Sequence, residues 1–194
     1  MKKIGVLALQ GAFIEHIAIL NSIGAEAVPV RLPEQLEGLD GLVIPGGEST
    51  TIGKLMKAHN LTIPLQKLIS EGLPVLGTCA GMILLANKVI DLNGYSLGVM
   101  DINVKRNAFG RQIDSFEADL HIPILGRIPF HAIFIRAPWI VDVGPGTDIL
   151  AELDDGTPVA AQAGNVLVAA FHPELTDDNR FHAYFLDMVE KRKQ

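Results

Sequence analysis

Short apolar runs alternate with amphipathic segments along most of the chain. Residues 4–9 and 166–171 are apolar runs bounded by turn residues or charges, as is typical of strands buried on both faces of a parallel sheet. Between such runs, Phe13, Ile17 and Leu20 recur at helical spacing. The alternation predicts βαβ units and an α/β fold with a mostly parallel central sheet. The predicted strands are residues 4–9, 27–31, 41–44, 74–77, 159–162 and 166–171.

Helices are predicted where apolar residues fall on one face and helix-ending residues follow. Gly24 and Gly72 stand where two helices would stop, and Pro64 suits the first turn of the second. From residue 95 to 149 the helical periodicity weakens, and residues 102–104 and 132–135 predict strands of an antiparallel or mixed part of the sheet. The predicted helices are residues 13–23, a segment beginning near Thr50 or Thr51, residues 62–72, residues 82–86, and residues 177–192 with Thr176 as cap.

Composition narrows the class of protein. A chain of 194 residues suits one α/β domain, and 48% hydrophobic with 20% charged residues is typical of a globular protein. The apolar runs are shorter than the roughly 18 residues a membrane span needs, and the first is too short for a signal peptide. A net charge of −6 gives no reason to expect nucleic acid. A single cysteine excludes an intrachain disulfide and favours a reducing cytoplasm.

Cys79 is the sharpest chemical feature. It lies in Gly77-Thr78-Cys79-Ala80-Gly81, after an apolar strand and before a predicted helix. This is the cysteine form of the nucleophile elbow, a tight turn that presents the nucleophile at a strand's carboxyl end. The N–H of Ala80 would then point to where an oxyanion forms. A buried structural cysteine is the alternative, but the glycine context at a strand–helix junction favours a nucleophile.

His172 is the best candidate for the base that such a thiol needs. In Phe171-His172-Pro173-Glu174 it follows an apolar strand, so it also emerges at the carboxyl edge where open α/β sheets place their sites. Proline extends the residue before it, and residues two apart in extended backbone face the same way. Glu174 can therefore reach and orient the imidazole. Alone, the motif is more often a solvated loop histidine; the elbow makes it the leading candidate.

The other histidines give no comparable signal. His16 and His59 lie on polar stretches and are expected at the surface, and His182 is expected on an exposed face of the last helix. No recognised zinc spacing is present, and we expect neither a metal nor another cofactor. A catalytic pair followed by helix-capping acids explains the alternative metal set near the C-terminus, which comprises His172, Glu174, Asp177, Asp178 and His182.

Two further features are ambiguous on chemistry alone. Gly46-Gly47 follows a predicted strand, and its N–H groups could line an oxyanion or phosphate pocket, or form an ordinary strand–helix turn. Arg106 and Arg136 carry guanidinium groups suited to gripping a substrate carboxylate, although most arginines are surface residues.

Taken together, these motifs resemble a known class of enzyme. Residues 45–49, 77–81 and 171–174 resemble the motifs of the class I (triad) glutamine amidotransferases. Further stretches are similar to the family of glutaminase subunits of pyridoxal 5′-phosphate synthases, and the resemblance runs from about residue 3 to the C-terminal helix. The triad motif specifies the class, whereas residues 106–112 point to this family. The further stretches are residues 7–13, 100–101, 106–112, 115–117 and 134–138.

The resemblance implies a flavodoxin-like three-layer α/β sandwich, with residues 1–194 forming a single glutamine amidotransferase domain. It implies that Cys79 attacks the side-chain amide of L-glutamine, that His172 acts as base and then acid, and that Glu174 orients His172. Ammonia leaves, and water hydrolyses the γ-glutamyl thioester to L-glutamate. The N–H groups of Gly47 and Ala80 would form the oxyanion hole. The implied glutamine contacts are Gly47, Glu48, Ser49, Arg106, Ile135 and Arg136.

The resemblance also implies a partner. Glutaminases of this family act in a hetero-oligomeric complex with a (β/α)₈-barrel synthase subunit and are typically activated only on docking. Ammonia passes to the barrel without release to bulk water and joins a pentose phosphate and a triose phosphate to build pyridoxal 5′-phosphate.

Two rival functions remain at this point. A cysteine peptidase or amidase on an α/β fold would also use an elbow cysteine and a histidine, but the C-terminal His-x-Glu and residues 106–112 argue against it. A binding subunit that keeps the fold only to stabilise a partner has no chemical reason to retain Cys79, His172 and Glu174 together.

Overall fold

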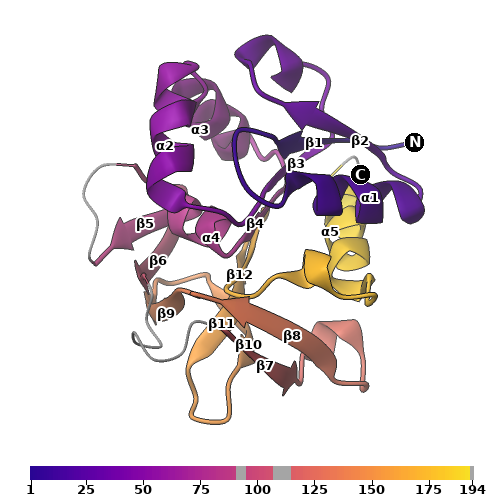
Figure 1. Cartoon of the computed structure of the whole chain (residues 1–194), viewed down its shortest axis with the longest axis vertical. Helices are drawn as coiled ribbons and strands as arrows, with labels where there is room; N and C mark the ends of the chain where they lie inside the picture. Colours follow the sequence, from indigo (N-terminus) through magenta and orange to yellow (C-terminus); the bar gives the residue numbers. More distant parts are fainter. Residues whose placement is uncertain (91–94, 107–114, 193–194) are drawn as a thin grey trace.

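The computed structural model describes residues 1–90, 95–106 and 115–192. Its centre is a seven-stranded sheet with the strand order β10-β11-β12-β4-β3-β1-β2 (Figure 1). The strands from β12 to β2 are parallel, whereas β11 and β10 extend the sheet antiparallel at one edge. The prediction of a mostly parallel central sheet is confirmed. The strands are β1 (Lys3–Leu7), β2 (Glu26–Val30), β3 (Gly41–Ile44), β4 (Val75–Thr78), β10 (Asp148–Glu152), β11 (Pro158–Ala163) and β12 (Val166–Ala169).

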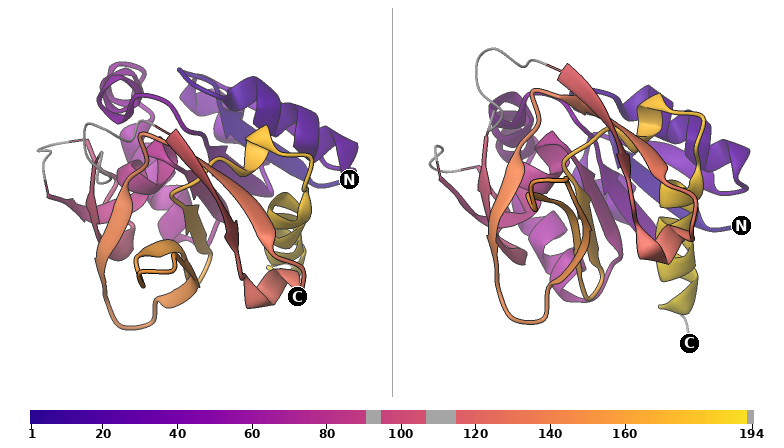
Figure 2. Two further views of the ribbon diagram at one scale, coloured as in Figure 1. Left: turned by 60° about the horizontal axis from the view of Figure 1, so that its bottom comes forward. Right: turned by 90° about the horizontal axis from the view of Figure 1, so that it is seen from below.

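Helices cover both faces of this sheet and make three layers (Figures 1 and 2). The helices α1 (Phe13–Ser22) and α5 (Arg180–Lys191) lie on one face. The other face is covered by α2 (Ser49–Ala58), α3 (Thr62–Ser70) and α4 (Ala80–Leu85). The central strands β3, β4 and β12 are buried along their whole lengths, which explains why they read as continuous apolar runs without a polar face.

The ends of the predicted helices are confirmed at some points and wrong at others. The first helix is followed by Gly24 with φ +87°, as a C-terminal stop requires. The last helix begins at Arg180 rather than at residue 177. Residues Pro173–Leu175 form a separate 3₁₀ turn, η3. Thr176 does not cap the helix: its hydroxyl accepts the N–H of Asp178, and the Asp178 carboxylate accepts the N–H of Arg180.

The middle of the chain forms two small sheets of its own. One has the order β5-β6-β9, and the other pairs β7 with β8. The expectation that residues 102–104 and 132–135 extend the central sheet is therefore wrong, because β6 pairs with β5 and β9, and β8 pairs with β7. The bounds are β5 (Ala86–Val89), β6 (Met100–Lys105), β7 (Ser115–Leu120), β8 (Phe130–Ile135) and β9 (Trp139–Val143), with 3₁₀ turns η1 (Pro33–Leu36) and η2 (Pro123–Leu125).

Four phenylalanines join the central sheet to β8 and α5. The ring of Phe171 lies with its centroid 5.6 Å from Phe130, 5.8 Å from Phe134 and 5.3 Å from Phe181. All four side chains are completely buried, and aromatic contacts of this kind dominate core energetics. The cluster fixes the backbone just before His172. None of the helices in the described ranges is long and apolar enough to cross a membrane.

Candidate active site

Three adjacent strands deliver the site at their carboxyl ends. Register places Ile44 of β3 beside Gly77 of β4, and Gly77 beside Val168 of β12. The segments that follow these strands therefore emerge side by side at one edge of the sheet. The N–H of Cys79 donates to the carbonyl of Ala169 over 2.8 Å, which ties the second segment to the third. This is the edge at which open α/β sheets bind their ligands.

Cys79 occupies a strained elbow between β4 and α4. Its φ of +48° and ψ of −103° are unusual for a residue with a side chain, a strain worth about 1–3 kcal/mol. The flanking glycines permit the turn. A Cβ on Gly77 would lie 2.8 Å from the carbonyl group of Gly81, and one on Gly81 would collide with the carbonyl oxygen of Ile44. The predicted elbow is confirmed in its backbone geometry.

His172 and Glu174 lie beside the elbow. The Nδ1 atom of His172 is 2.6 Å from Oε1 of Glu174, so the motif brings the carboxylate to the imidazole as predicted. Gly46 lies against both His172 and Cys79. A Cβ on Gly46 would collide with the His172 ring and lie 3.3 Å from Cβ of Cys79. Burial lowers the pKa of His172, but hydrogen bonds with Cys79 and Glu174 outweigh it and raise this pKa to about 10. Cys79 and Glu174 therefore stabilise a proton that is held on His172.

A pocket of about 390 Å³ opens over these groups, a volume within the roughly 300–1,000 Å³ usual for small-molecule sites. Its lining contains Cys79, His172 and every residue that the resemblance implies for glutamine contact. Ala80 is not part of the lining, but it begins α4, so its N–H has no partner within that helix. The lining residues are Gln10, Gly47, Glu48, Ser49, Cys79, Ile83, Arg106, Ile135, Arg136 and His172.

Glu48 and Arg106 form the polar rim of the pocket. The Glu48 carboxylate caps α2, with its oxygens 3.1 Å from the N of Thr50 and 2.5 Å from the N of Thr51. Burial slightly opposes ionisation, but these hydrogen bonds lower the pKa of Glu48 to about 2. Arg106 lies 3.6 Å from Glu48 and donates to the Thr50 hydroxyl over 3.3 Å. The rim therefore carries groups of both charges.

Sequence reasoning missed four residues at or near the site. Gln10 and Ile83 line the pocket, and Gln10 accepts the N–H of Glu48 over 2.8 Å. His16 and His182 were expected at the surface, yet both are completely buried, so that expectation is wrong. His16 follows Phe13 by three residues and precedes Leu20 by four, a helical spacing that places it on the apolar stripe of α1.

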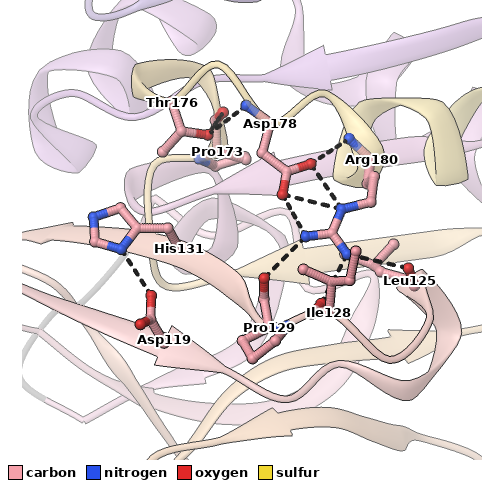
Figure 3. Close-up of polar contacts among 9 residues, drawn as sticks. All are labelled: Asp119, Leu125, Ile128, Pro129, His131, Pro173, Thr176, Asp178 and Arg180. Atoms are coloured by element: carbon pink, nitrogen blue, oxygen red, sulfur yellow. Dashed lines mark hydrogen bonds and ion pairs between the residues drawn. The ribbon is translucent and has the colours of Figure 1, made fainter.

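The segment carrying Glu174 is anchored from its far end. Figure 3 shows the guanidinium of Arg180 meeting the carboxylate of Asp178 and the carbonyls at the start of β8. Those carbonyl contacts are 3.3 Å to Leu125, 2.8 Å to Ile128 and 3.0 Å to Pro129. The chain between His172 and α5 is thus tied to the strand whose Ile133 carbonyl accepts the N–H of His172 over 2.8 Å. Of the resemblance motif at 106–112, residues 107–112 lie outside the described residues.

The fold is that of the class I glutamine amidotransferases. A solved structure described as a glutamine amidotransferase superposes with a TM-score of 0.91 and is 48% identical, covering 96% of this chain and 98% of its own. The family model of the SNO glutamine amidotransferases matches residues 6–191, and the chain belongs to this family.

Curated relatives agree with that assignment. The pyridoxal 5′-phosphate synthase subunit PdxT of Pelotomaculum thermopropionicum is 60% identical, over 99% of this chain and 97% of the relative. The subunit of the same name from Carboxydothermus hydrogenoformans is 57% identical, over 97% of this chain and 98% of the relative. The family expected from the motifs is confirmed.

Proposed function

We propose that this chain is the glutaminase subunit of a pyridoxal 5′-phosphate synthase, hydrolysing L-glutamine to L-glutamate and ammonia. The observation that supports this most directly is the position of Cys79: a strained elbow cysteine, beside a histidine–glutamate pair, faces a pocket with charged groups of both signs. The identity of 57–60% with subunits of that name supports the same assignment.

In the proposed reaction, Cys79 is the nucleophile and His172 moves the protons. The Sγ proton passes to His172 as Sγ attacks the side-chain amide carbon, and the carbonyl oxygen becomes an oxyanion. The N–H groups of Gly47 and Ala80 stabilise that charge. The intermediate collapses as His172 returns the proton to the amide nitrogen, releasing ammonia and leaving a γ-glutamyl thioester. Water then attacks the thioester, giving its proton to His172, and L-glutamate leaves with the thiol restored.

Recognition of glutamine follows from its main-chain charges. An α-ammonium group suits Glu48, which is ionised at neutral pH because its pKa is about 2. An α-carboxylate suits the guanidinium groups of Arg106 and Arg136, which also line the pocket. Ser49, Ile135 and the backbone of Gly47 complete the proposed contacts. The side-chain amide would then extend toward Cys79 in the floor of the pocket.

The proposed partner is the (β/α)₈-barrel synthase subunit, which would receive the ammonia and build the cofactor. We also propose that residues 1–194 form one amidotransferase domain, since a single apolar cluster spans β1 to α5 in the described part of the chain. The protein is proposed to work in the cytoplasm, where a reducing environment keeps the lone cysteine in the thiol form that the mechanism needs.

The deciding experiment measures glutamate and ammonia release from L-glutamine by the chain alone and with the barrel subunit. Turnover that rises with the partner and disappears in Cys79→Ala is the expected result. A folded Cys79→Ala chain that still binds the barrel separates loss of chemistry from loss of assembly. Absence of turnover in both conditions, with folded protein and a competent barrel, would overturn the proposal.

A further inference from the structure

A buried polar cluster lies behind Glu174, on the side away from the pocket. It joins His16 of α1, Thr78 of β4 and His182 of α5 to the Glu174 carboxylate, and all three of these residues are 0% exposed. His16 Nδ1 lies 2.8 Å from His182 Nε2. His16 Nε2 lies 3.1 Å from the Thr78 hydroxyl and 3.3 Å from Oε2 of Glu174. The triad therefore continues inward through two further imidazoles.

Neither histidine has a part in the proposed reaction, yet burying them is costly. A polar group removed from water without compensation destabilises the fold by about 1–3 kcal/mol. Both rings also sit where leucine or phenylalanine would continue the apolar stripes of their helices. Packing alone therefore does not explain why two histidines are buried at these positions.

The position of Glu174 favours one of the two tautomers that the contacts of His16 with His182 and Thr78 allow. Oε2 of Glu174 is an acceptor and repels a ring lone pair, so His16 carries its hydrogen on Nε2. Nδ1 of His16 is then the acceptor, and His182 must carry its hydrogen on Nε2. This leaves Nδ1 of His182 as a bare acceptor, and that atom is buried without a hydrogen-bond partner among the described residues. In this tautomer the unpaired atom of His182 is an acceptor, so no N–H of the two rings is buried without an acceptor.

Both rings are neutral in this arrangement. Burial lowers the pKa of His16 well below its usual value, and the neighbouring His182 and His172 lower it further. Burial also lowers the pKa of His182 to about 4. A neutral donor stabilises a carboxylate through its N–H dipole without competing as a second cation. His172 therefore remains the imidazole that gains the proton.

Glu174 has one oxygen for each side of this arrangement. Oε1 faces the base over 2.6 Å, while Oε2 is buried and has no conventional hydrogen bond within the described ranges. The structure places His16 Nε2 3.3 Å from Oε2.

We propose that His16 is a positioning residue for the glutaminase reaction: the dipole of its Nε2–H, with Nε2 3.3 Å from the inner oxygen of Glu174, stabilises that carboxylate, and His182 fixes the His16 tautomer. The inference rests on the proposed function for its effect on turnover, but not for the tautomers themselves. Through Glu174, the pair keeps His172 oriented and able to accept the Cys79 proton.

Few other ionisable groups face Glu174. From α1 the group is His16, since Glu15 is exposed; from α5 it is His182; and from the pocket side it is His172 beside Cys79. Strand β8 also packs on η3, but its ionisable residue, His131, is exposed and engaged with Asp119 (Figure 3) and with Glu117. The pH dependence of the triad is therefore readable through the four buried groups.

The first measurement is long-range ¹H–¹⁵N NMR of the unmodified chain at neutral pH. We expect neutral rings with the hydrogen on Nε2 for both His16 and His182. A His16 ring with its hydrogen on Nδ1, or a charged ring, would overturn the proposal without any variant having to fold.

The second measurement compares His16→Leu, which removes the donor, with His16→Gln, which keeps an amide N–H. In the complex with the barrel subunit, His16→Leu should lower kcat about tenfold with little change in KM, and His16→Gln should recover most of that loss. Leu20→Ala is the matched control, because Leu20 is fully buried on the same helix face and its side chain has no hydrogen-bond donor. If Leu20→Ala lowers kcat as far at equal loss of stability, His16 is only structural.

The third measurement separates this inference from the proposed function. The chain has one cysteine, so alkylation by iodoacetamide in the isolated chain reports Cys79 alone. We expect His16→Leu to alkylate several-fold more slowly at neutral pH and to need higher pH for the same rate, with His16→Gln near the unmodified chain. An unchanged alkylation profile in folded His16→Leu refutes the positioning role, even if the unmodified chain turns over no glutamine.

Discussion

The two walls of the pocket are built differently. The sheet-side wall contains Gly47, Cys79 and His172, which follow adjacent strands, and the N–H groups of Cys79 and His172 donate to backbone carbonyls. The outer wall contains Arg106 and Arg136, which follow strands of the two small sheets. Cys79 is 6% exposed, whereas the Arg106 side chain is 24% exposed. Cys79 and His172, which are proposed to react, are held by backbone hydrogen bonds, whereas Arg106, which is proposed to recognise the ligand, is held by side-chain contacts with Glu48 and Thr50.

The largest expected loss of activity comes from changing Cys79, the proposed nucleophile in the sheet-side wall. We expect Cys79→Ala to lower kcat by about 10⁴-fold or more, since removing the attacking atom leaves only binding and oxyanion stabilisation. Steady-state glutamate release checks this, with thermal unfolding as the control for folding. Residual turnover above that level would contradict the covalent mechanism.

The second largest expected effect comes from Glu174→Gln, which changes the carboxylate behind His172. The amide keeps the shape of the side chain but removes the charge that stabilises the His172 imidazolium. We expect kcat to fall on the order of 100-fold while some activity remains. An unchanged kcat would remove Glu174 from the site.

Acid should lower the stability of the fold through the two buried histidines behind the sheet-side wall. His16 and His182 have lowered pKa values in the folded chain, so below about pH 6.5 the unfolded chain takes up protons that the folded chain resists. Their contribution is complete above about pH 6.5 and is lost as pH falls toward 4. As pH falls from 6 to 5, proton uptake by these two histidines in the unfolded chain should lower the unfolding free energy by about 2 kcal/mol.

Chemical denaturation across that range checks the slope. The raised pKa of His131, caused by hydrogen bonds to Asp119 and Glu117, has the opposite sign: its contribution is present at low pH and lost as pH rises. The variant His131→Gln should therefore keep the loss of stability between pH 6 and pH 5. A variant with leucine at both buried histidines, His16→Leu with His182→Leu, should flatten it; an unaltered slope there would assign the loss to other groups.

On the outer wall, Arg106→Met should act on binding more than on chemistry. Loss of the guanidinium should raise the KM for glutamine about tenfold and leave kcat within a few-fold. Arg127→Met, at an exposed arginine outside the pocket lining, is the matched control. Equal effects of the two variants would exclude a specific role for Arg106.

The smallest expected effect concerns the anchor between the two walls. Arg180→Met removes the contacts with Asp178 and three carbonyls (Figure 3) and should lower the unfolding free energy by about 1 kcal/mol. Lys191→Met on the exposed end of α5 is the control, with little change expected. A stable Arg180→Met chain would mean that the phenylalanine cluster alone holds this segment.

The sequence was sufficient for the parts of the molecule governed by local rules. Continuous apolar runs predicted β3 and β12, and the glycine context predicted the elbow at Cys79, because each depends on residues within a few positions. The burial of His16 could not be read this way. Its reason for being inside is Glu174, which lies 158 positions later and reaches it only after the sheet has formed. The same holds for Arg180, whose carbonyl partners lie more than 50 positions away.

The strand order also sets a timetable for the growing chain. Cys79 is synthesised with β4, but His172 arrives only with β12, which docks directly beside β4. During synthesis at about 5–20 residues per second, the ribosome-bound N-terminal part holds a thiol without its base for several seconds. The nascent chain therefore cannot turn over glutamine, and its chemistry begins only when the last strand of the central sheet has been inserted.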